Sequence, residues 1–196
     1  MTVRCARKFQ AFEERAHAHQ QGAAWIVLIL PLAAAAWICF DSHADGRANT
    51  MVTHFDHVTI VVRDVGKAKA FFALLGFVEQ QSVVISGGQF SRYMRVPGIE
   101  AEHVTLALAD ATPRVEVQLL HYRHPEPIRD VDIGRLDKLG FNHVCFTVED
   151  IEAEVRRLTA SGIELRNEVM EFHDRKLVFL AGPEGVTVEL AQWLKH

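Results

Sequence analysis

Hydrophobic and polar residues follow the same order in two stretches of the chain that lie 86 positions apart. Residues 56–65 (DHVTIVVRDV) match residues 142–151 (NHVCFTVEDI), and both stretches alternate with a period of two. Farther along, residues 115–119 match residues 186–190 with an offset of 71. Internal repetition of this kind indicates two copies of one structural unit. The difference in offset predicts fifteen extra residues in the first copy, most simply in a loop around residues 89–102.

Each copy predicts the element order βαβββ. The period-two stretches are typical of strands, Asp64 and Asp150 stand where a helix N-cap belongs, and Gly76 and Gly162 are placed to end the helices. The expected helices cover residues 67–75 and 151–160. The later strands are expected at residues 77–86, 104–109 and 115–122 in the first copy, and at 165–172, 176–180 and 186–193 in the second. The predicted fold class is α+β, a domain at residues 52–195 with tandem modules at about residues 52–122 and 141–195.

Strand alternation divides the residues of each copy between two faces of a sheet, because successive side chains point to opposite sides. Val58, Ile60 and Val62 share an aliphatic face that must pack on the helices, so His57 lies on the helix-free face. The same alternation places three more polar residues on a helix-free face: Gln118, His143 and Glu189. Two such halves that face each other would bring the four residues together.

Two imidazoles, one carboxylate and one amide oxygen suit a divalent metal ion. Mixed nitrogen and oxygen ligation without thiolate fits Zn, Ni, Co, Mn or Fe(II) and does not choose among them. A lone histidine in a strand is more often a surface or core residue than a ligand, but histidines at the same position of both copies favour a metal site. The remaining histidines lack this symmetry and are expected to be ordinary surface residues: His54, His103, His121, His124, His173 and His196.

These residues resemble the vicinal oxygen chelate superfamily, which includes glyoxalase I, methylmalonyl-CoA epimerase, extradiol dioxygenases, and the fosfomycin and bleomycin resistance proteins. The resemblance covers about residues 52–195. It is carried by His57-Val58 with Asp64, by His143-Val144 with Asp150-Ile151, and by residues 179–190 (FLAGPEGVTVEL). It implies a half-open mixed sheet around a metal cleft that takes a small-molecule substrate. One divalent metal would be held there by His57, Gln118, His143 and Glu189.

The resemblance is strong for the superfamily and weak for the reaction. The ligand order His, Gln, His, Glu is most similar to that of methylmalonyl-CoA epimerases. The expected activity is therefore that of a metal-dependent isomerase or lyase of the glyoxalase/epimerase kind, which stabilises an enolate of a substrate with vicinal oxygens. Glu189, Glu116 and Glu102 are the candidate catalytic carboxylates. The alternatives are an Fe(II) extradiol-type dioxygenase and a non-catalytic drug-binding resistance protein.

Residues 1–50 form an N-terminal extension that does not belong to the repeated pattern. Residues 23–40 are an uncharged apolar run of 18 residues, which is near the lower limit for a helix that crosses a bilayer. Three interpretations stay open: a membrane anchor, a signal peptide, or a translation start at Met51. A start at Met51 predicts a cytoplasmic protein, and the other two predict an exported or inner-membrane anchored one.

Charge and cysteine content limit the classes of partner and the kinds of site that we expect. The formal net charge is −4, and residues 51–196 hold 16 Lys and Arg against 21 Asp and Glu. This acidic balance argues against nucleic acid as a partner. Cys5, Cys39 and Cys145 form no CxxC pair, so neither a disulfide framework nor a zinc knuckle is expected. We expect a homodimer, with the cleft built either within one chain or between two.

Overall fold

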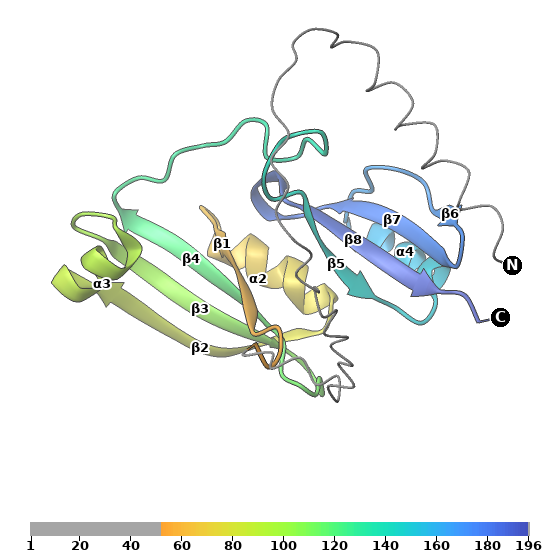
Figure 1. The fold of residues 1–196 in the computed structure, drawn as a ribbon, viewed down its shortest axis with the longest axis horizontal. Coiled ribbons are helices and arrows are strands. Elements are labelled where there is room, and N and C mark those ends of the chain that lie inside the picture. The colour runs from red at the N-terminus through yellow and green to blue at the C-terminus, as the bar shows by residue number, and fades with distance from the viewer. Residues whose placement is uncertain (1–51, 196) are drawn as a thin grey trace, which may run out of the picture. The chain divides into compact units, whose positions relative to one another are not determined.

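The computed structural model describes residues 52–195 (Figure 1). The predicted N-terminal extension, residues 1–50 with the apolar run at 23–40, lies outside these residues. Within the described part of the chain, no helix is both long enough and apolar enough to cross a membrane.

Two four-stranded sheets follow each other along the chain. The first contains β1 (His57–Val61), β2 (Phe77–Ser86), β3 (Glu100–Leu108) and β4 (Glu116–His124), in the spatial order β1-β4-β3-β2. The second contains β5 (His143–Thr147), β6 (Met170–Phe172), β7 (Arg175–Ala181) and β8 (Thr187–Trp193), in the order β5-β8-β7-β6. In each sheet the first strand runs parallel to the last and the other neighbours are antiparallel. The prediction of an α+β fold with tandem βαβββ modules is therefore confirmed.

One helix crosses over in each module, α2 (Val65–Leu74) in the first and α4 (Ile151–Ala160) in the second. Asp64 and Asp150 cap them as predicted: each carboxylate accepts a hydrogen bond from the backbone N–H three residues farther on, at 2.9 Å. Such a cap satisfies an N–H group that has no partner inside the helix. After α2 the chain turns at Gly76, where φ is +87°, a conformation that glycine adopts at little cost.

A hydrophobic core connects the two modules and includes the inner sides of both helices. Alternate residues of the outer strands face this core, in the pattern expected from the sequence: Val58, Ile60, Val62, Val117, Leu119, Val144, Phe146, Val186, Val188 and Leu190. Phe72 of α2 and Leu158 of α4 are fully buried in it. Because the aliphatic faces are turned to the core, the polar residues between them lie on the helix-free faces.

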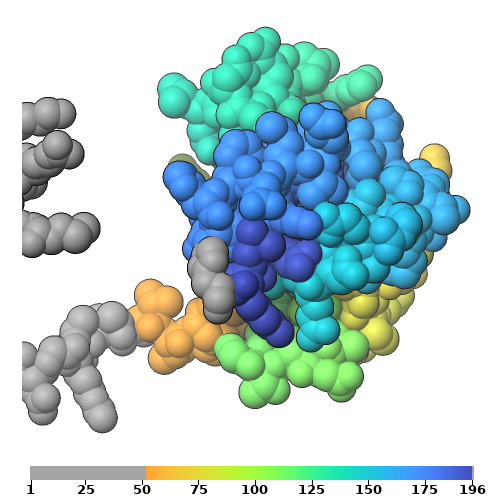
Figure 2. Space-filling view, turned by 90° about the vertical axis from the view of Figure 1, so that its right-hand side faces the viewer, coloured from red at the N-terminus to blue at the C-terminus, as the bar shows by residue number. Residues whose placement is uncertain are grey.

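The modules meet through residues of this core. Phe77 at the start of β2 packs edge-to-face against Phe146 of β5, with ring centroids 5.4 Å apart. Arg157 of α4 donates a hydrogen bond from Nη2 to the backbone carbonyl of Leu74 in α2, at 2.6 Å. The linker at residues 125–142 contains no helix or strand. Figure 2 shows linker residues in green to teal, at one end of the second module in blue.

The fifteen-residue insert of the first module does not form the expected loop. Gly87–Met94 is a helix, α3, and β3 already begins at Glu100. A second, smaller core explains the difference: Met94, Val96 and Ile99 pack on Ile85, Ala101, Leu120 and Tyr122. The insert therefore covers one end of the first helix-free face, where Leu120 lies.

The strand expected at residues 165–172 is reduced to β6. Leu165 forms only an isolated bridge with Leu180. Asn167 lies between Leu165 and β6 in the sequence, and its side-chain Oδ1 accepts a hydrogen bond from the Phe179 backbone N–H at 2.7 Å. A side-chain acceptor thus replaces a main-chain partner and interrupts the ladder.

Candidate functional site

The histidine that opens each module is held by the side chain before it. Nδ1 of His57 lies 2.6 Å from the Asp56 carboxylate, and Nδ1 of His143 lies 2.7 Å from Oδ1 of Asn142. Both partners are acceptor oxygens, so the tautomer that donates from Nδ1 to them is the one whose Nε2 carries no proton. Metal-binding histidines are commonly oriented in this way.

Glu189 is nearly buried on the second sheet. Only 9% of its surface is exposed, and its Oε2 lies 3.4 Å from Nε2 of His143. Phe179, the neighbour of Glu189 across β7 and β8, packs its ring against His143 with centroids 5.3 Å apart. An isolated carboxylate is costly to bury. The position beside His143 and Glu189 therefore favours a positive charge.

Cys145 lies next to Glu189 on the neighbouring strand. Cys145 is exposed as a residue, but partial burial of its thiol, followed by the hydrogen bond to Glu189 and the negative charge of that residue, raises the pKa of the thiol to about 12. The thiol therefore remains protonated at neutral pH and donates to the carboxylate. Since thiolates are the reactive and metal-binding form, Cys145 is not a candidate nucleophile.

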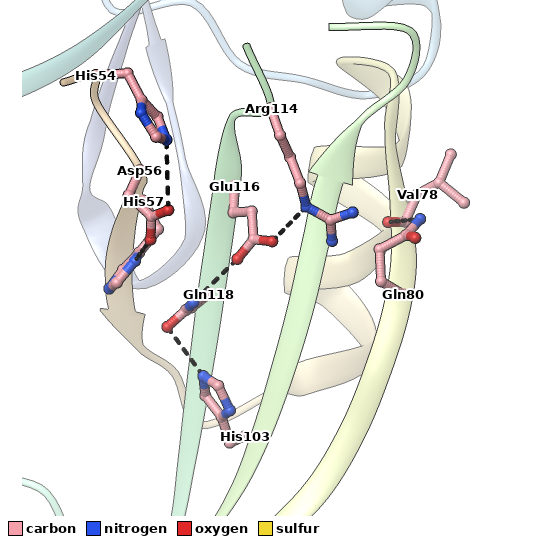
Figure 3. Close-up of polar contacts among 9 residues, drawn as sticks. All are labelled: His54, Asp56, His57, Val78, Gln80, His103, Arg114, Glu116 and Gln118. Atoms are coloured by element: carbon pink, nitrogen blue, oxygen red, sulfur yellow. Dashed lines mark hydrogen bonds and ion pairs between the residues drawn. The ribbon is translucent and has the colours of Figure 1, made fainter. Parts of the chain in front are cut away.

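On the first sheet, four polar side chains form one hydrogen-bonded row (Figure 3). Arg114 Nε donates to Oε1 of Glu116 at 2.6 Å, and Gln118 Nε2 donates to Oε2 of Glu116 at 3.1 Å. His103 Nε2 lies 3.0 Å from Oε1 of Gln118. Burial opposes ionisation of Glu116, but the hydrogen bonds from Gln118 and Arg114 outweigh it and lower the pKa of this carboxyl. Both oxygens of an ionised Glu116 thus have a partner.

His103 was expected to be an ordinary surface residue, and the structure places it in this row. The third strand begins at Glu100, four residues before the predicted start, so His103 is a strand residue. A signal for this placement exists in the sequence. Val104 faces the core, and counting back one residue puts His103 on the helix-free face with Gln118.

Glu102 lies on the other side of the first sheet. It shares the core side with Val104, and its Oε1 accepts a hydrogen bond from the Ser82 hydroxyl at 2.9 Å. The structure therefore brings Glu116 to Gln118 and keeps Glu102 away from both.

The four predicted ligands lie in two pairs, one on each sheet. His57 and Gln118 are on the neighbouring strands β1 and β4, and His143 and Glu189 are on β5 and β8. Within residues 52–195, no three His, Cys, Asp or Glu side chains are grouped closely enough to hold one metal ion. The second pair has a suitable spacing. Two ligands of a tetrahedral ion with bonds of ~2.1 Å lie about 3.4 Å apart, the distance between the His143 and Glu189 donor atoms.

A cavity of about 850 Å³ runs along β1, which is an edge strand of the first sheet. Its wall includes consecutive residues 58–63 and residues 127–131 of the linker. Two of the apolar lining residues are largely exposed, Ile128 at 99% and Phe141 at 58%. The outer edge of β1 therefore presents backbone groups and apolar side chains at the surface of the described chain.

Comparison with protein families identifies the fold. The family described as the Glyoxalase/Bleomycin resistance protein/Dioxygenase superfamily matches residues 56–179. The chain belongs to this superfamily. The superfamily match spans His57, Gln118 and His143, and it ends before Glu189.

Individual relatives of this superfamily protein include glyoxalases. The lactoylglutathione lyase of Pseudomonas putida is 28% identical over 153 residues, covering 70% of this chain and 84% of that enzyme. Glyoxalase I of Saccharomyces cerevisiae is 33% identical over 57 residues, so this chain spans only 18% of its length. A solved glyoxalase family protein from Bacillus cereus has a TM-score of 0.67 at 29% identity, covering 76% of this chain and 99% of that one.

Proposed function

We propose that this protein is a divalent-metal-dependent isomerase or lyase of the glyoxalase/epimerase kind, with His57, Gln118, His143 and Glu189 as the metal ligands. The observation that carries the proposal is the hydrogen bond from Nδ1 of each histidine to the preceding side chain. In the tautomer that donates from Nδ1, Nε2 of each ring is the nitrogen that can coordinate a metal. The similarity to the lactoylglutathione lyase of Pseudomonas putida supports this class of reaction.

The donor set fits a divalent ion. Imidazole, carboxylate and amide oxygen are ligands for Zn, Ni, Co, Mn and Fe(II), and a cation would compensate the buried charge of Glu189. When bound, the metal supplies a Lewis acid that stabilises negative charge developing on the adjacent oxygens of a small substrate.

Glu189 is the carboxylate that we assign to proton transfer. Both oxygens of Glu116 are engaged, one by Arg114 and the other by Gln118, so Glu116 orients the row and is not free to accept a proton. The Glu189 carboxylate faces the imidazole of His143 at 3.4 Å and has no lysine or arginine partner among residues 52–195. Without a fixed cationic partner, it can accept the proton from the substrate carbon next to the carbonyl group when it is not occupied as a metal ligand.

The complete site would need two copies of the chain. Each copy presents two of the four ligands on each helix-free face. Within residues 52–195, no three His, Cys, Asp or Glu side chains lie close enough together to hold one metal ion. Among residues 52–195, the edge strands β1 and β5 each have a strand neighbour on one side only. A homodimer in which the first module of one copy faces the second module of the other would combine His57 and Gln118 with His143 and Glu189.

The test measures metal content and proton transfer in the full-length protein. Elemental analysis is expected to give one divalent ion per chain, and both Gln118→Ala and Glu189→Ala are expected to lower that occupancy. The loaded protein is then given the hemithioacetal of methylglyoxal and glutathione, or an α-substituted malonyl thioester, in deuterium oxide. Exchange of the carbon-bound proton is expected, with loss in Glu189→Gln.

Other outcomes would assign another function. Unchanged metal content in both ligand variants would refute the ligand set. Iron in the purified protein together with oxygen uptake on addition of a catechol would indicate the ring-cleaving dioxygenase. A protein that binds its ligand equally well after chelation of metals would be a binding protein instead of an enzyme.

A further inference from the structure

The row of polar side chains on the first sheet fixes the orientation of one proposed ligand. Glu116 is ion-paired with Arg114 at 2.6 Å, and as a carboxylate it only accepts hydrogen bonds. The group of Gln118 that reaches Glu116 must therefore be the amide NH2. It follows that the carbonyl oxygen Oε1 of Gln118 is the end that faces His103.

The same argument sets the proton on His103. An amide oxygen is an acceptor, so Nε2 of His103 must carry the hydrogen in the 3.0 Å contact with Gln118. His103 is half-buried in this position. The Gln118 side chain is thus held at both ends, by Glu116 through its nitrogen and by His103 through its oxygen.

The second module has no counterpart to this histidine. His103 pairs across the sheet with Leu120, and the corresponding pair in the second module is Leu177 with Ala191. The second module therefore forms the same βαβββ fold with a leucine at the position of His103. The duplicated fold does not require His103, which points to a role that belongs to the first module alone.

We propose that His103 is a positioning residue that holds the carbonyl oxygen of Gln118 in the orientation needed to bind the cation. This inference rests on the proposed function, because it assigns a purpose to an orientation of Gln118 in the metal site. Oxygen, and not nitrogen, is the coordinating end of an amide. A freely rotating amide would present the wrong end part of the time, and the bonds to His103 and Glu116 prevent this. Residues that orient metal ligands commonly change metal affinity by 10–100-fold when they are replaced.

The experiment compares Zn²⁺ affinity, by competition with a chelating dye, in six forms of the full-length protein, the wild type included. His103→Leu is expected to raise the Kd about tenfold, and His103→Gln, which keeps an N–H donor, is expected to restore most of the affinity. In a Gln118→Ala background, His103→Leu is expected to have no further effect, since its partner is gone. His124→Leu, at an exposed histidine on β4, is the matched control and is expected to leave the Kd unchanged.

A second measurement examines the hydrogen bond in metal-free protein. The side-chain NH2 resonances of Gln118, assigned by their absence in Gln118→Ala, are expected to shift in His103→Leu and to return toward their original positions in His103→Gln. Unchanged resonances would overturn the assignment of the bond.

The two proposals fail in different ways. A wild-type protein that binds no divalent cation would refute the proposed function. If Gln118→Ala weakens Zn²⁺ binding while His103→Leu does not, or if the two substitutions are additive, the function stands and the role of His103 is refuted.

Discussion

Thr187 carries a buried hydroxyl without a partner. Among residues 52–195, its Oγ1 is a buried side-chain polar atom that makes no hydrogen bond, and the residue is 0% exposed. Burial of an unsatisfied hydroxyl is unfavourable. Thr187→Val, which replaces the hydroxyl by a methyl group, is therefore expected to raise the free energy of unfolding by about 1 kcal/mol, measured by urea titration.

The control for Thr187 is a substitution that keeps the hydroxyl. Thr187→Ser removes one methyl group from a packed position and is expected to lower the free energy of unfolding by about 1 kcal/mol. A less stable Thr187→Val protein would mean that the hydroxyl has a hydrogen-bond partner in solution.

The raised pKa of Cys145 predicts slow alkylation. A thiol with a pKa of about 12, against the ordinary 9.0, has about a thousandfold less thiolate at pH 8. In a Cys5→Ser/Cys39→Ser background, iodoacetamide is expected to modify Cys145 far more slowly in folded than in urea-denatured protein. The rate should rise as the pH approaches 12, because deprotonation supplies the nucleophile.

A substitution of Glu189 tests the cause of this slow reaction. Burial is the largest cause of the shift and Glu189 the next. Glu189→Gln removes the negative charge and leaves the strand in place, so it should speed the alkylation of Cys145 at pH 8. Equal rates in the two proteins would show that the carboxylate does not act on the thiol.

Sequence alternation located the candidate residues on a face and did not locate them relative to one another. It placed Gln118 and Glu116 on the helix-free side because a period of two is a property of the strand itself. It assigned no face to His103 or Glu102, because the third strand was predicted to begin at residue 104 and begins at Glu100. The bonds of His57 and His143 go to Asp56 and Asn142, which precede the strands, and a period of two carries no information about the chain before a strand.

At the scale of elements, the caps of the crossover helices are predictable and testable. Asp150 accepts from the Ala153 backbone N–H at 2.9 Å, and Asp150→Ala is expected to lower the free energy of unfolding by about 1 kcal/mol. Asp150→Asn keeps a side-chain oxygen that can accept the same bond, and it should cost only a fraction of that amount. If urea titration finds the two variants equally unstable, the charge of Asp150 and not its cap bond would be the stabilising feature.

Repetition predicted these elements well where both copies agree and poorly where they differ. The crossover helices and the last strands occur in both copies, and the structure matches their predicted bounds within two residues. The insert has no second copy, and its helix begins with Gly87 and Gly88, which are poor helix formers and so do not predict a helix. Its fold is decided by the packing of Met94 and Val96 on Leu120, a contact between residues far apart in sequence.

At the scale of the whole molecule, the two-copy site makes a prediction that a one-chain site does not. One variant carries His57→Ala and Gln118→Ala and so lacks the ligands of the first module. A second variant carries His143→Ala and Glu189→Ala and lacks those of the second. If sites form between copies, the mixed dimer contains one site with all four ligands and one with none. Its expected metal content is therefore half that of the wild type, whereas each variant alone binds little.

The same mixture distinguishes a site between two copies from a site within one chain. If all four ligands came from one chain, every site in the mixture would lack two of them, and mixing would restore nothing. The variants are refolded together from urea so that the chains can exchange, and the mixed species is isolated by two different affinity tags. Sedimentation at several protein concentrations is the control, because the mixing experiment requires that the protein is a dimer. A mixed dimer without metal would place the complete site within one chain, and β1 and β5 would then have to approach each other from the positions that they occupy in this structure.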